Sequence, residues 1–428
     1  MQPKIFHTND HDIDPSFIDA DAIYVIKKLR EAGFIAYLVG GSVRDLLVKK
    51  TPKDFDISTS ARPEQIKQIF QRNCLLIGRR FRLAHVRFGH KILEVSTFRS
   101  GENDSDLIVQ DNSWGSPEED VLRRDFTING LYYDPENHSI IDYVGGWDDI
   151  HKHTLRTIGE PSMRFKQDPV RMIRLLKFKA RFGFEVDPAT WHALHKCQHE
   201  IVKSSPARIL EEIFRMLESG ASDAFFKLMT DSGLLELLFP CLTFFLKGES
   251  AKDTYSYLAQ ADAINRENIK KPLDRTILTA CLLFPMLEKE IHAKYLQYNQ
   301  IPHFGDILLL TGHLIKGVLT SSFSHFPRRL SMMINFILTT QFRMTPYSGK
   351  RHHRPKLLHN KEFELALKFL KIRSLVDQSL TDDYQWWLHQ YQQVGRQSAH
   401  RGRHPHPPPH ADREHRAPQN DDDDYVEL

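Results

Sequence analysis

Residues 37–59 read YLVGGSVRDLLVKKTPKDFDIST, and this stretch decides the fold of the amino-terminal part of the chain. An apolar run typical of a strand ends at Val39, the pair Gly40 and Gly41 follows, and residues 43–48 have a helical pattern. Two glycines between a strand and a helix let a triphosphate come close to the backbone, and the free N–H groups at the helix start favour negative charge. The stretch therefore predicts a phosphate-binding turn.

The second half of this stretch contains two carboxylates, Asp54 and Asp56, and its residues 55–58 predict a strand. Side chains two positions apart on a strand point to the same face of a sheet. Carboxylate oxygens on one face suit Mg²⁺, and two such ions about 3.5–4 Å apart can activate a hydroxyl and stabilise a leaving pyrophosphate. We therefore predict that Asp54 and Asp56 form a two-metal Mg²⁺ site. Without the glycine turn, the pair would fit a solvated strand end equally well.

A third carboxylate for this site is expected from Glu94, within the strand pattern of residues 92–98. Residues 83–88 predict a further strand, joined to it by a hairpin turn. A charged side chain among apolar strand neighbours needs a partner, and a strand that carries Glu94 beside Asp54 and Asp56 would provide one. The alternative for Glu94 is an ordinary solvated strand position.

Composition sets the limits for the rest of the 428-residue chain. Apolar residues make up 41%, which indicates a globular protein. The formal net charge is +3, so any nucleic-acid site must come from a local cluster of charge. None of the four cysteines forms a C-x-x-C pair, which argues against a disulfide framework and a cysteine zinc site. No apolar stretch resembles a signal peptide or could span a bilayer, so the chain is expected to be soluble and cytoplasmic, without a membrane partner.

Strand and helix patterns alternate as far as about residue 160, and the strand patterns nearly vanish beyond it. This predicts an α+β fold with a head at residues 1–160, built from a small mixed β-sheet with helices. An all-α neck at 161–225 and an all-α body at 226–395 are expected to follow. Residues 396–428 are rich in Arg, His and Pro and cannot bury enough apolar surface to fold, so they are predicted to be a disordered tail.

The glycine pair and the Asp-x-Asp sequence, with twelve residues between them, resemble the nucleotidyltransferase superfamily of DNA polymerase β. The full string at 37–59 is similar to the class II branch, which contains bacterial poly(A) polymerases and CCA-adding tRNA nucleotidyltransferases. The likeness continues in the same order through RRDFTIN at 123–129, DYVGG at 142–146 and DPVRMIR at 168–174. It covers residues 20–240 strongly and implies a nucleotidyltransferase head followed by a helical neck, body and tail.

The resemblance implies a role for each matching position. Asp54 and Asp56 resemble the catalytic pair that binds the metal ions, and Asp125 is the alternative to Glu94 as the further carboxylate. Contacts with the nucleotide triphosphate and sugar are implied for a group of glycine, arginine and asparagine positions, which are Gly40, Gly41, Arg44, Arg123, Arg124 and Asn129.

Asp168 and Arg171 match the pair that reads the edge of the base in class II enzymes, and Arg174 follows in the same nucleotide-binding string. A fixed acceptor and a fixed donor can select a base without a template. The family usually has Glu before this Asp, whereas this chain has Gln167, which carries no charge. Because Pro169 follows it, Asp168 also fits a simple helix N-cap, and the two interpretations are compatible.

Two basic clusters are candidate RNA contacts. Basic residues recur at three- and four-residue steps after residue 168, which places them on one face of a helix. Part of this stripe could face the nucleotide and part could follow RNA phosphates, with a solvated helix face as the alternative. The RNA contacts predicted from the stripe are Lys177 and Arg181, and those predicted from the basic segment 349–356, for which a solvated loop is the alternative, are Lys350, Arg351 and Arg354.

Residues 75–86, LLIGRRFRLAHV, separate the two activities of the class II branch. The string resembles the signature of bacterial poly(A) polymerases, and CCA-adding relatives usually lack the G-R-R-F-x-L-x-H form. Arg79 and Arg80 within it are predicted to contact RNA. A solvated charge run followed by an ordinary strand is the alternative.

The resemblance therefore implies a template-independent poly(A) polymerase that depends on Mg²⁺. The 3′-hydroxyl of an RNA would attack the α-phosphate of ATP, and pyrophosphate would leave. The cellular role implied is the tagging of RNA 3′ ends for decay, with proteins of RNA decay as expected partners. A CCA-adding tRNA nucleotidyltransferase is the alternative enzyme, and a non-catalytic RNA-binding relative is the alternative from a different class.

Overall fold

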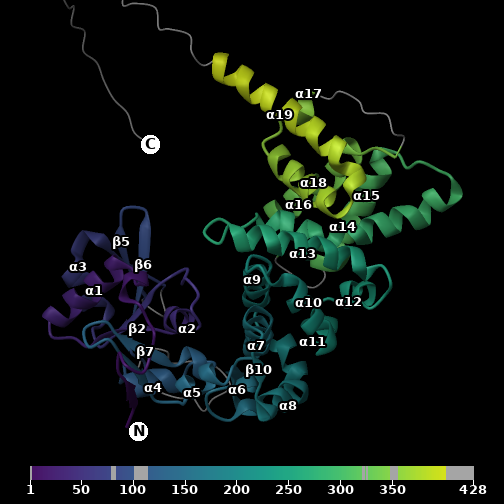
Figure 1. Cartoon of the computed structure of the whole chain (residues 1–428). Coiled ribbons are helices and arrows are strands. Elements are labelled where there is room, and N and C mark those ends of the chain that lie inside the picture. Colours follow the sequence, from purple (N-terminus) through teal and green to yellow (C-terminus); the bar gives the residue numbers. More distant parts are fainter. Residues whose placement is uncertain are drawn as a thin grey trace, which may run out of the picture.

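The computed structural model describes residues 2–78, 83–100, 114–320, 323, 326–347 and 355–401. Figure 1 shows a head that contains the sheet at one end of the molecule and a helical body at the other, with helices α7 (Val170–Phe182) and α9 (Pro206–Leu217) between them. The expected order of a mixed-sheet head and a helical remainder is confirmed. Among these residues, no helix is long and apolar enough to cross a membrane.

The head is built on an eight-stranded mixed sheet with the strand order β1-β8-β7-β2-β3-β6-β5-β4. β3 and β6 pair in parallel, and the other neighbours are antiparallel. The edge strands β1 and β4 have only three and four residues, too few for a clear alternation, and the sequence pattern does not indicate them. The strands are β1 (Lys4–Phe6), β2 (Ala36–Val39), β3 (Asp56–Thr59), β4 (Cys74–Ile77), β5 (Leu83–Phe88), β6 (Lys91–Thr97), β7 (Leu131–Asp134) and β8 (Ser139–Asp142).

Helices in the head pack their apolar faces against this sheet. In α1 the side chain of Asp19 caps the first turn, and Val25 and Leu29 are buried. α2 begins at Gly41, directly after Gly40, two residues earlier than the sequence pattern indicates. The helices of the head are α1 (Ala20–Glu31), α2 (Gly41–Leu47), α3 (Pro63–Phe70), α4 (Pro117–Leu122) and α5 (Gly146–His151).

The described chain is helical beyond residue 186. A short parallel pair, β9 (Thr154–Leu155) with β10 (Glu185–Val186), joins the end of the head to the segment after α7. The other helices are α6 (Pro161–Gln167), α8 (Pro188–Cys197), α10 (Ser222–Asp231), α11 (Leu234–Leu238), α12 (Pro240–Leu246), α13 (Ala251–Glu267), α14 (Arg275–Lys294), α15 (Phe304–Ile315), α16 (Arg328–Met344), α17 (Pro355–Leu358), α18 (Phe363–Val376) and α19 (Thr381–Arg401).

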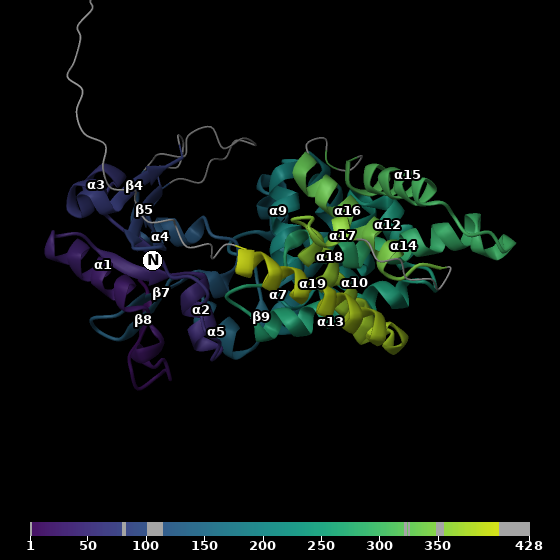
Figure 2. The ribbon, with the colours of Figure 1, turned by 90° about the horizontal axis from the view of Figure 1, so that it is seen from above.

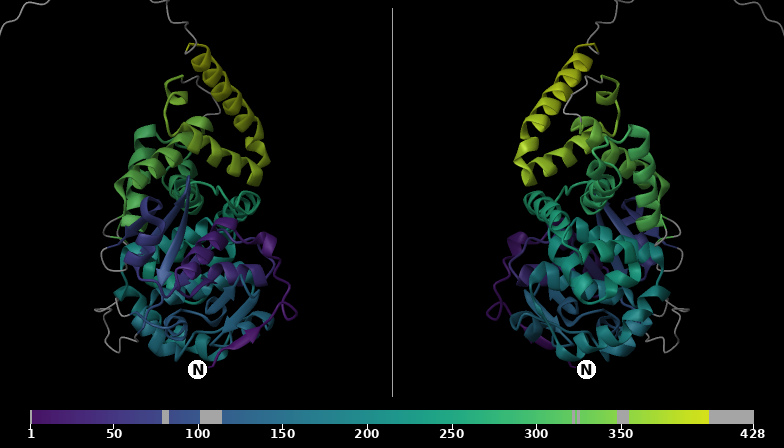
Figure 3. Two further views of the ribbon diagram at one scale, coloured as in Figure 1. Left: turned by 90° about the vertical axis from the view of Figure 1, so that its left-hand side faces the viewer. Right: turned by 90° about the vertical axis from the view of Figure 1, so that its right-hand side faces the viewer.

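The last helix changes one expected boundary. α19 ends at Arg401, so residues 396–401 of the predicted tail are helical. Figure 3 shows α19 projecting from the body at the end opposite the amino terminus. The rest of the predicted tail, 402–428, lies outside the described residues.

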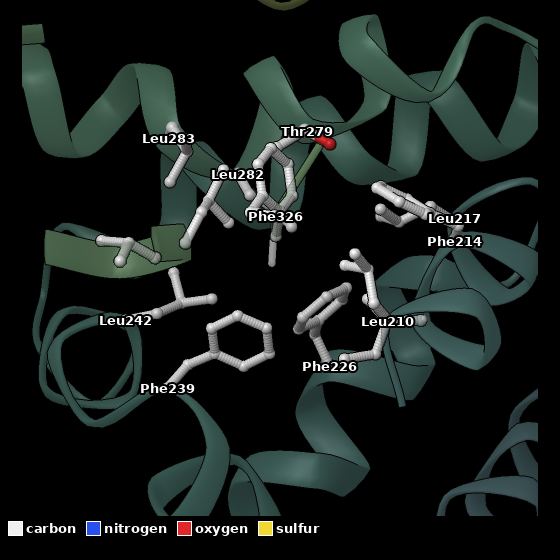
Figure 4. Close-up of a pocket in the computed structure, with 13 residues that line it drawn as sticks. Leu210, Phe214, Leu217, Phe226, Phe239, Leu242, Thr279, Leu282, Leu283 and Phe326 are labelled. Carbon is white, nitrogen blue, oxygen red and sulfur yellow. The ribbon is translucent and has the colours of Figure 1, made fainter. Parts of the chain in front are cut away.

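One hydrophobic core extends from the sheet into the body, and it includes Ile57 of β3, Leu176 of α7, Phe214 of α9 and Leu283 of α14. A cavity of about 20 Å³ lies in this core, where α9, α10, α12 and α14 meet, and Figure 4 shows the residues that line it. The lining is apolar except for Thr279, and the volume is close to the minimum for a single water. The cavity is too small for a ligand, so α9 is firmly packed on the body.

Candidate active site

The strand–turn–helix unit predicted at residues 37–59 is present. β2 ends at Val39, Gly40 has a φ of 71°, and α2 begins at Gly41. This φ lies in the left-handed region, and a Cβ on Gly40 would lie 3.2 Å from Arg124 Nη1. Both facts favour glycine, and the turn therefore lets Arg124 come close to the backbone.

Two of the predicted carboxylates lie side by side on the sheet. β3 and β6 are parallel neighbours, and Asp56 stands directly opposite Glu94 in their register, as predicted. Asp54 lies two residues before the start of β3, so it is near Asp56 but outside the strand. All three side chains are exposed to solvent. We call these three residues the carboxylate row.

The electrostatics of the carboxylate row suit a cation. The Asp56 carboxylate touches solvent but has protein on most sides, and this partial burial, followed by the charge of Glu94, raises the pKa of Asp56 to about 6. Arg124 and Arg215 oppose the shift, and Asp54 adds to it. Carboxylates that repel one another are suitable ligands for Mg²⁺. Within the described ranges, no three His, Cys, Asp or Glu side chains are already grouped as a metal site, so waters and substrate phosphates would have to complete the coordination.

Asp125 has a different environment, because it is buried and its contacts are internal. Its Oδ1 accepts from the Asn129 side chain at 2.9 Å and from the Phe126 N–H at 2.8 Å, and its Oδ2 accepts from Arg174 Nε at 2.8 Å. Burial alone would raise the pKa of Asp125, but the charge of Arg174 and these hydrogen bonds lower the pKa well below its usual range. The geometry favours Glu94 over Asp125 as the third carboxylate.

Arg44, an expected triphosphate contact, is buried between the head and α7. Its Nη1 donates to Asn129 Oδ1 at 2.6 Å, and its Nε and Nη2 donate to Asp45 Oδ1 at 2.9 and 2.7 Å. The guanidinium carbon lies 4.9 and 4.7 Å from the ring centres of Phe178 and Phe182. The side chain is only 5% exposed, and its contacts in this structure are internal to the protein.

The basic stripe predicted along α7 is present, but Arg171 pairs with Asp168 at 4.0 Å and three further members pair with carboxylates outside α7. Burial and the nearby charge of Arg174 lower the pKa of Lys177 to about 8. The pairs connect α7 with the head and with α9, so an RNA contact by Lys177 or Arg181 requires one pair to open. They are Arg174 with Asp125 and Glu212, Lys177 with Glu212, and Arg181 with Asp45.

Asp168 lies just before α7, and Arg171 lies in the first turn of this helix. Each side chain both makes a hydrogen bond and has one further buried polar atom. Asp168 Oδ2 accepts from Arg208 Nη2 at 2.8 Å, and Arg171 Nη2 donates to the Arg123 carbonyl at 3.1 Å. Asp168 Oδ1 and Arg171 Nη1 are buried and have no hydrogen-bond partner in the described part of the chain. The two spare atoms are one acceptor and one donor, which is the combination expected for reading a base edge.

The interpretation of Asp168 as a helix N-cap is wrong. α7 begins at Val170 with Pro169 in the cap position, and Asp168 ends α6 as its C-cap. The carboxylate is turned toward Arg208 of α9, and this charge-assisted hydrogen bond replaces the capping bond.

The residues around Gln167 hold the RRD segment in place. Gln167 Oε1 accepts from Arg164 Nη1 at 3.2 Å, and Arg164 Nη2 donates to the carbonyls of Leu122 and Arg124 at 3.1 and 2.8 Å. Arg124 itself donates to Asp120 at 2.9 Å. The neutral Gln167 therefore contacts the backbone around the RRD segment only indirectly, by accepting a hydrogen bond from Arg164.

Two arginines of this region, Arg208 and Arg215 on α9, were missed by reasoning from the sequence. The available signal is their spacing of seven residues, which places both on one helix face. The predicted RNA contacts Arg79, Arg80, Lys350, Arg351 and Arg354 lie outside the described residues.

A glycine turn between a strand and a helix, next to carboxylates on adjacent strands and opposite a helical neck, defines a nucleotidyltransferase. The family model of the poly(A) polymerase head domain matches residues 36–156. Models of the probable RNA and SrmB-binding site of polymerase A and of the polymerase A arginine-rich C-terminus match 183–246 and 318–421. The chain belongs to the poly(A) polymerase family.

Individual relatives agree with this family. The chain is 35% identical over 400 residues to poly(A) polymerase I of Salmonella typhi, which covers 90% of this chain and 84% of the relative. A CCA-adding enzyme of Lactobacillus johnsonii is 37% identical, but over 217 residues that cover 50% of this chain and 54% of the relative. The solved structure of the Bacillus stearothermophilus CCA-adding enzyme with CTP has a TM-score of 0.60 at 24% identity, covers 87% of this chain and 82% of that one, and shows the shared fold.

Proposed function

We propose that this chain is a template-independent poly(A) polymerase, which adds AMP from ATP to RNA 3′-hydroxyl ends and releases pyrophosphate. The observation that carries this proposal is the extent of the likeness. The poly(A) polymerase I relative aligns with 90% of the chain, from the head through the helical body, whereas the CCA-adding relative aligns with 50%. The division into head (1–160), neck (161–225) and body (226–395) belongs to this proposal.

The carboxylate row is the proposed metal site. Asp54, Asp56 and Glu94 would hold Mg²⁺, which would activate the RNA hydroxyl and neutralise charge on the leaving pyrophosphate. The support is the parallel register of Asp56 with Glu94 and the raised pKa of Asp56. In this proposal, Asp125 is a positioning residue that holds Arg174 and Asn129.

The spare atoms of Asp168 and Arg171 are the proposed base-reading pair. Adenine offers a donor at N6 and an acceptor at N1, which complement Asp168 Oδ1 and Arg171 Nη1. Guanine and uracil offer these groups in the reverse order and would leave buried polar atoms unpaired. Cytosine offers the donor and the acceptor in the same order as adenine. The choice between these two bases would therefore depend on how far from the base Arg208 holds Asp168 and the Arg123 carbonyl holds Arg171.

RNA 3′ ends are the proposed second substrate. The match to an RNA-binding family model at 183–246 supports this assignment. Arg79, Arg80, Lys350, Arg351 and Arg354 remain proposed RNA contacts. Lys177 and Arg181 are better explained as links between the head and α7, because both are paired with carboxylates. Proteins of RNA decay remain expected partners.

A primer-extension gel tests the proposal. A generic RNA and a tRNA without its CCA end would each receive Mg²⁺ and one nucleotide at a time, and then all four. A long ladder with ATP alone on the generic RNA is expected. Addition of a few residues that is confined to tRNA and requires CTP would instead identify a CCA-adding enzyme, and an absence of addition to both would favour a non-catalytic RNA-binding protein.

A further inference from the structure

A second cavity lies where the head meets the carboxyl end of α7, and the proposed function does not use it. Its volume is about 390 Å³, which is in the range of sites for small molecules. Residues at or just after the ends of α2, α5 and α7 line it. Figure 2 shows these three helices close to one another at the border of the head. We call this cavity the junction cavity.

The junction cavity is separate from the proposed active site. The amino-terminal ends of α2 and α7 lie at that site, because α2 begins at the glycine turn and α7 begins at the base-reading pair. Later turns of the two helices contact each other, since Arg181 of α7 donates to Asp45 of α2 at 2.9 Å. The cavity lies beyond this contact, so the 13 residues of α7, about 20 Å, separate it from the base-reading pair.

Cations and imidazoles supply the polar groups of the junction cavity. Lys50 Nζ lies 4.6 Å from the centre of the Phe182 ring and donates to the Arg181 carbonyl at 3.2 Å. Lys49 pairs with Asp12 at 3.1 Å, but these side chains are 75% and 82% exposed, so water screens the pair. Among the described residues that line the cavity, none is a carboxylate, and those with polar side chains are Lys49, Lys50, His151 and His153.

The carboxylates next to the junction cavity are already paired. Arg44 and Arg181 both pair with Asp45, so two guanidinium groups share one carboxylate. Partial burial and the charge of Arg181 lower the pKa of Lys50, and Asp45 opposes this shift only in part. The pairs made by the carboxylates of α5 are Asp148 with Lys4 and Asp149 with Arg156. The cavity is therefore surrounded by more positive than negative charge, which favours an anion.

The rest of the lining is apolar and includes Val48, Ile150 and Phe184. The His153 ring lies against Phe184 with the ring centres 4.9 Å apart, and its nitrogens have no hydrogen-bond partner in the described part of the chain. Beside apolar groups the local dielectric constant is lower than in water, so an anion is attracted more strongly there than on an open surface.

We propose that the junction cavity is a phosphate-binding site outside the active site, in which Lys49, Lys50 and His153 bind a phosphate group of RNA or of a free phosphate compound. Ammonium and imidazole N–H groups form charge-assisted hydrogen bonds with phosphate oxygens. The cavity is larger than one phosphate requires, and Val48 and Ile150 can pack against the sugar of a nucleotide. Only RNA as the source of the phosphate rests on the proposed function.

The test is calorimetric titration of the full chain with inorganic pyrophosphate and with a short oligo(A) RNA. EDTA is present, so that no Mg²⁺ draws pyrophosphate to the carboxylate row. Lys50→Gln combined with His153→Asn should weaken binding of at least one probe by about tenfold. Asparagine suits position 153, where φ is 51°. Lys50→Arg alone should retain binding, since it keeps the charge.

Lys152→Gln is the matched control, because Lys152 is an exposed lysine next to His153 and does not line the cavity. A loss for oligo(A) alone would identify RNA as the source, and a loss for pyrophosphate would identify a free phosphate compound. Unchanged binding of both probes, or an equal loss in Lys152→Gln, would overturn the proposal. Failure of the proposed function would appear separately, as no addition of AMP by the wild-type chain in the primer-extension gel.

Discussion

Two carboxylate clusters of this protein are built on opposite principles. The carboxylate row of Asp54, Asp56 and Glu94 is exposed, and its negative charges repel one another. Asp125 is buried and pairs with Arg174, which also contacts Glu212. The carboxylate row keeps negative charge that a cation can neutralise. The charges of Asp125 and Glu212 are instead neutralised by Arg174, and these ion pairs connect the head with α7 and α9. Carboxylates in a nucleotide site can therefore serve either binding or architecture, and their partners decide which.

The largest expected effect is the loss of activity when the carboxylate row is removed. Asp54→Ala combined with Asp56→Ala should reduce AMP addition at least about 10³-fold, because the metal-binding charge is gone. RNA binding, measured by gel shift, should be retained. The fold should also be retained, since both side chains are exposed. Undiminished addition would contradict the metal assignment.

Breaking the buried cluster should instead cost stability. Arg174→Ala removes the cation that pairs with the buried Asp125 and one of the two cations that pair with Glu212, and should lower the free energy of unfolding by about 3–5 kcal/mol. Urea denaturation measures this value. The exposed pair of Lys247 with Glu236 provides the control, because Lys247→Ala breaks a solvent-screened pair and should leave the free energy of unfolding nearly unchanged. Equal effects of the two substitutions would remove the contrast between buried and exposed pairs.

A smaller effect is expected at the glycine turn. Gly40→Ala places a Cβ at positive φ and 3.2 Å from Arg124 Nη1, so it should destabilise the protein by about 1–2 kcal/mol. Addition of AMP should fall as well, because the turn must shift. Gly183→Ala is the matched control, since Gly183 also has a positive φ but no atom within 4 Å of its added Cβ. If both variants lost the same activity, the close approach at Gly40 would be irrelevant.

The smallest expected effect is a pH dependence of opposite sign in the two clusters. The pKa of Asp56 is raised to about 6, so its contribution to stability is fully present below pH 4 and is lost as pH rises through 6. Asp56→Asn removes this loss, so the difference in Tm between variant and wild type should grow in favour of the variant from pH 4 to 6 in EDTA. Mg²⁺ should reduce the difference.

Asp125 provides the counterpart of this measurement. Its pKa is lowered, so its contribution is present above its ordinary pKa and is lost only as pH falls below that range. Asp125→Asn should therefore be less stable than the wild type, by an amount that is constant between pH 5 and 7. A growing advantage of this variant across pH 4–6 would show that the two clusters do not differ as described.

The sequence predicts the parts of the site that depend on local spacing. Gly40 and Gly41 fall at the strand–helix junction, and the apolar pattern places Glu94 in a strand, β6, whose register with β3 brings it opposite Asp56. The same reasoning predicts the basic stripe of α7 but not the partners of its residues. Arg181 contacts Asp45 across 136 positions of the chain, and no periodicity connects the two.

The sequence by itself indicated the class of the protein, because the glycine turn, the Asp-x-Asp sequence and the motifs that follow them in the same order resemble the nucleotidyltransferase superfamily. Only the tertiary structure decided which charges remain free for substrate. Arg44 and Asp125 match substrate-binding motifs. In the folded chain, however, Arg44 donates to Asp45 and Asn129, and Asp125 accepts from Arg174. A buried charge must find a partner, and which partner it finds depends on three-dimensional contacts between distant residues.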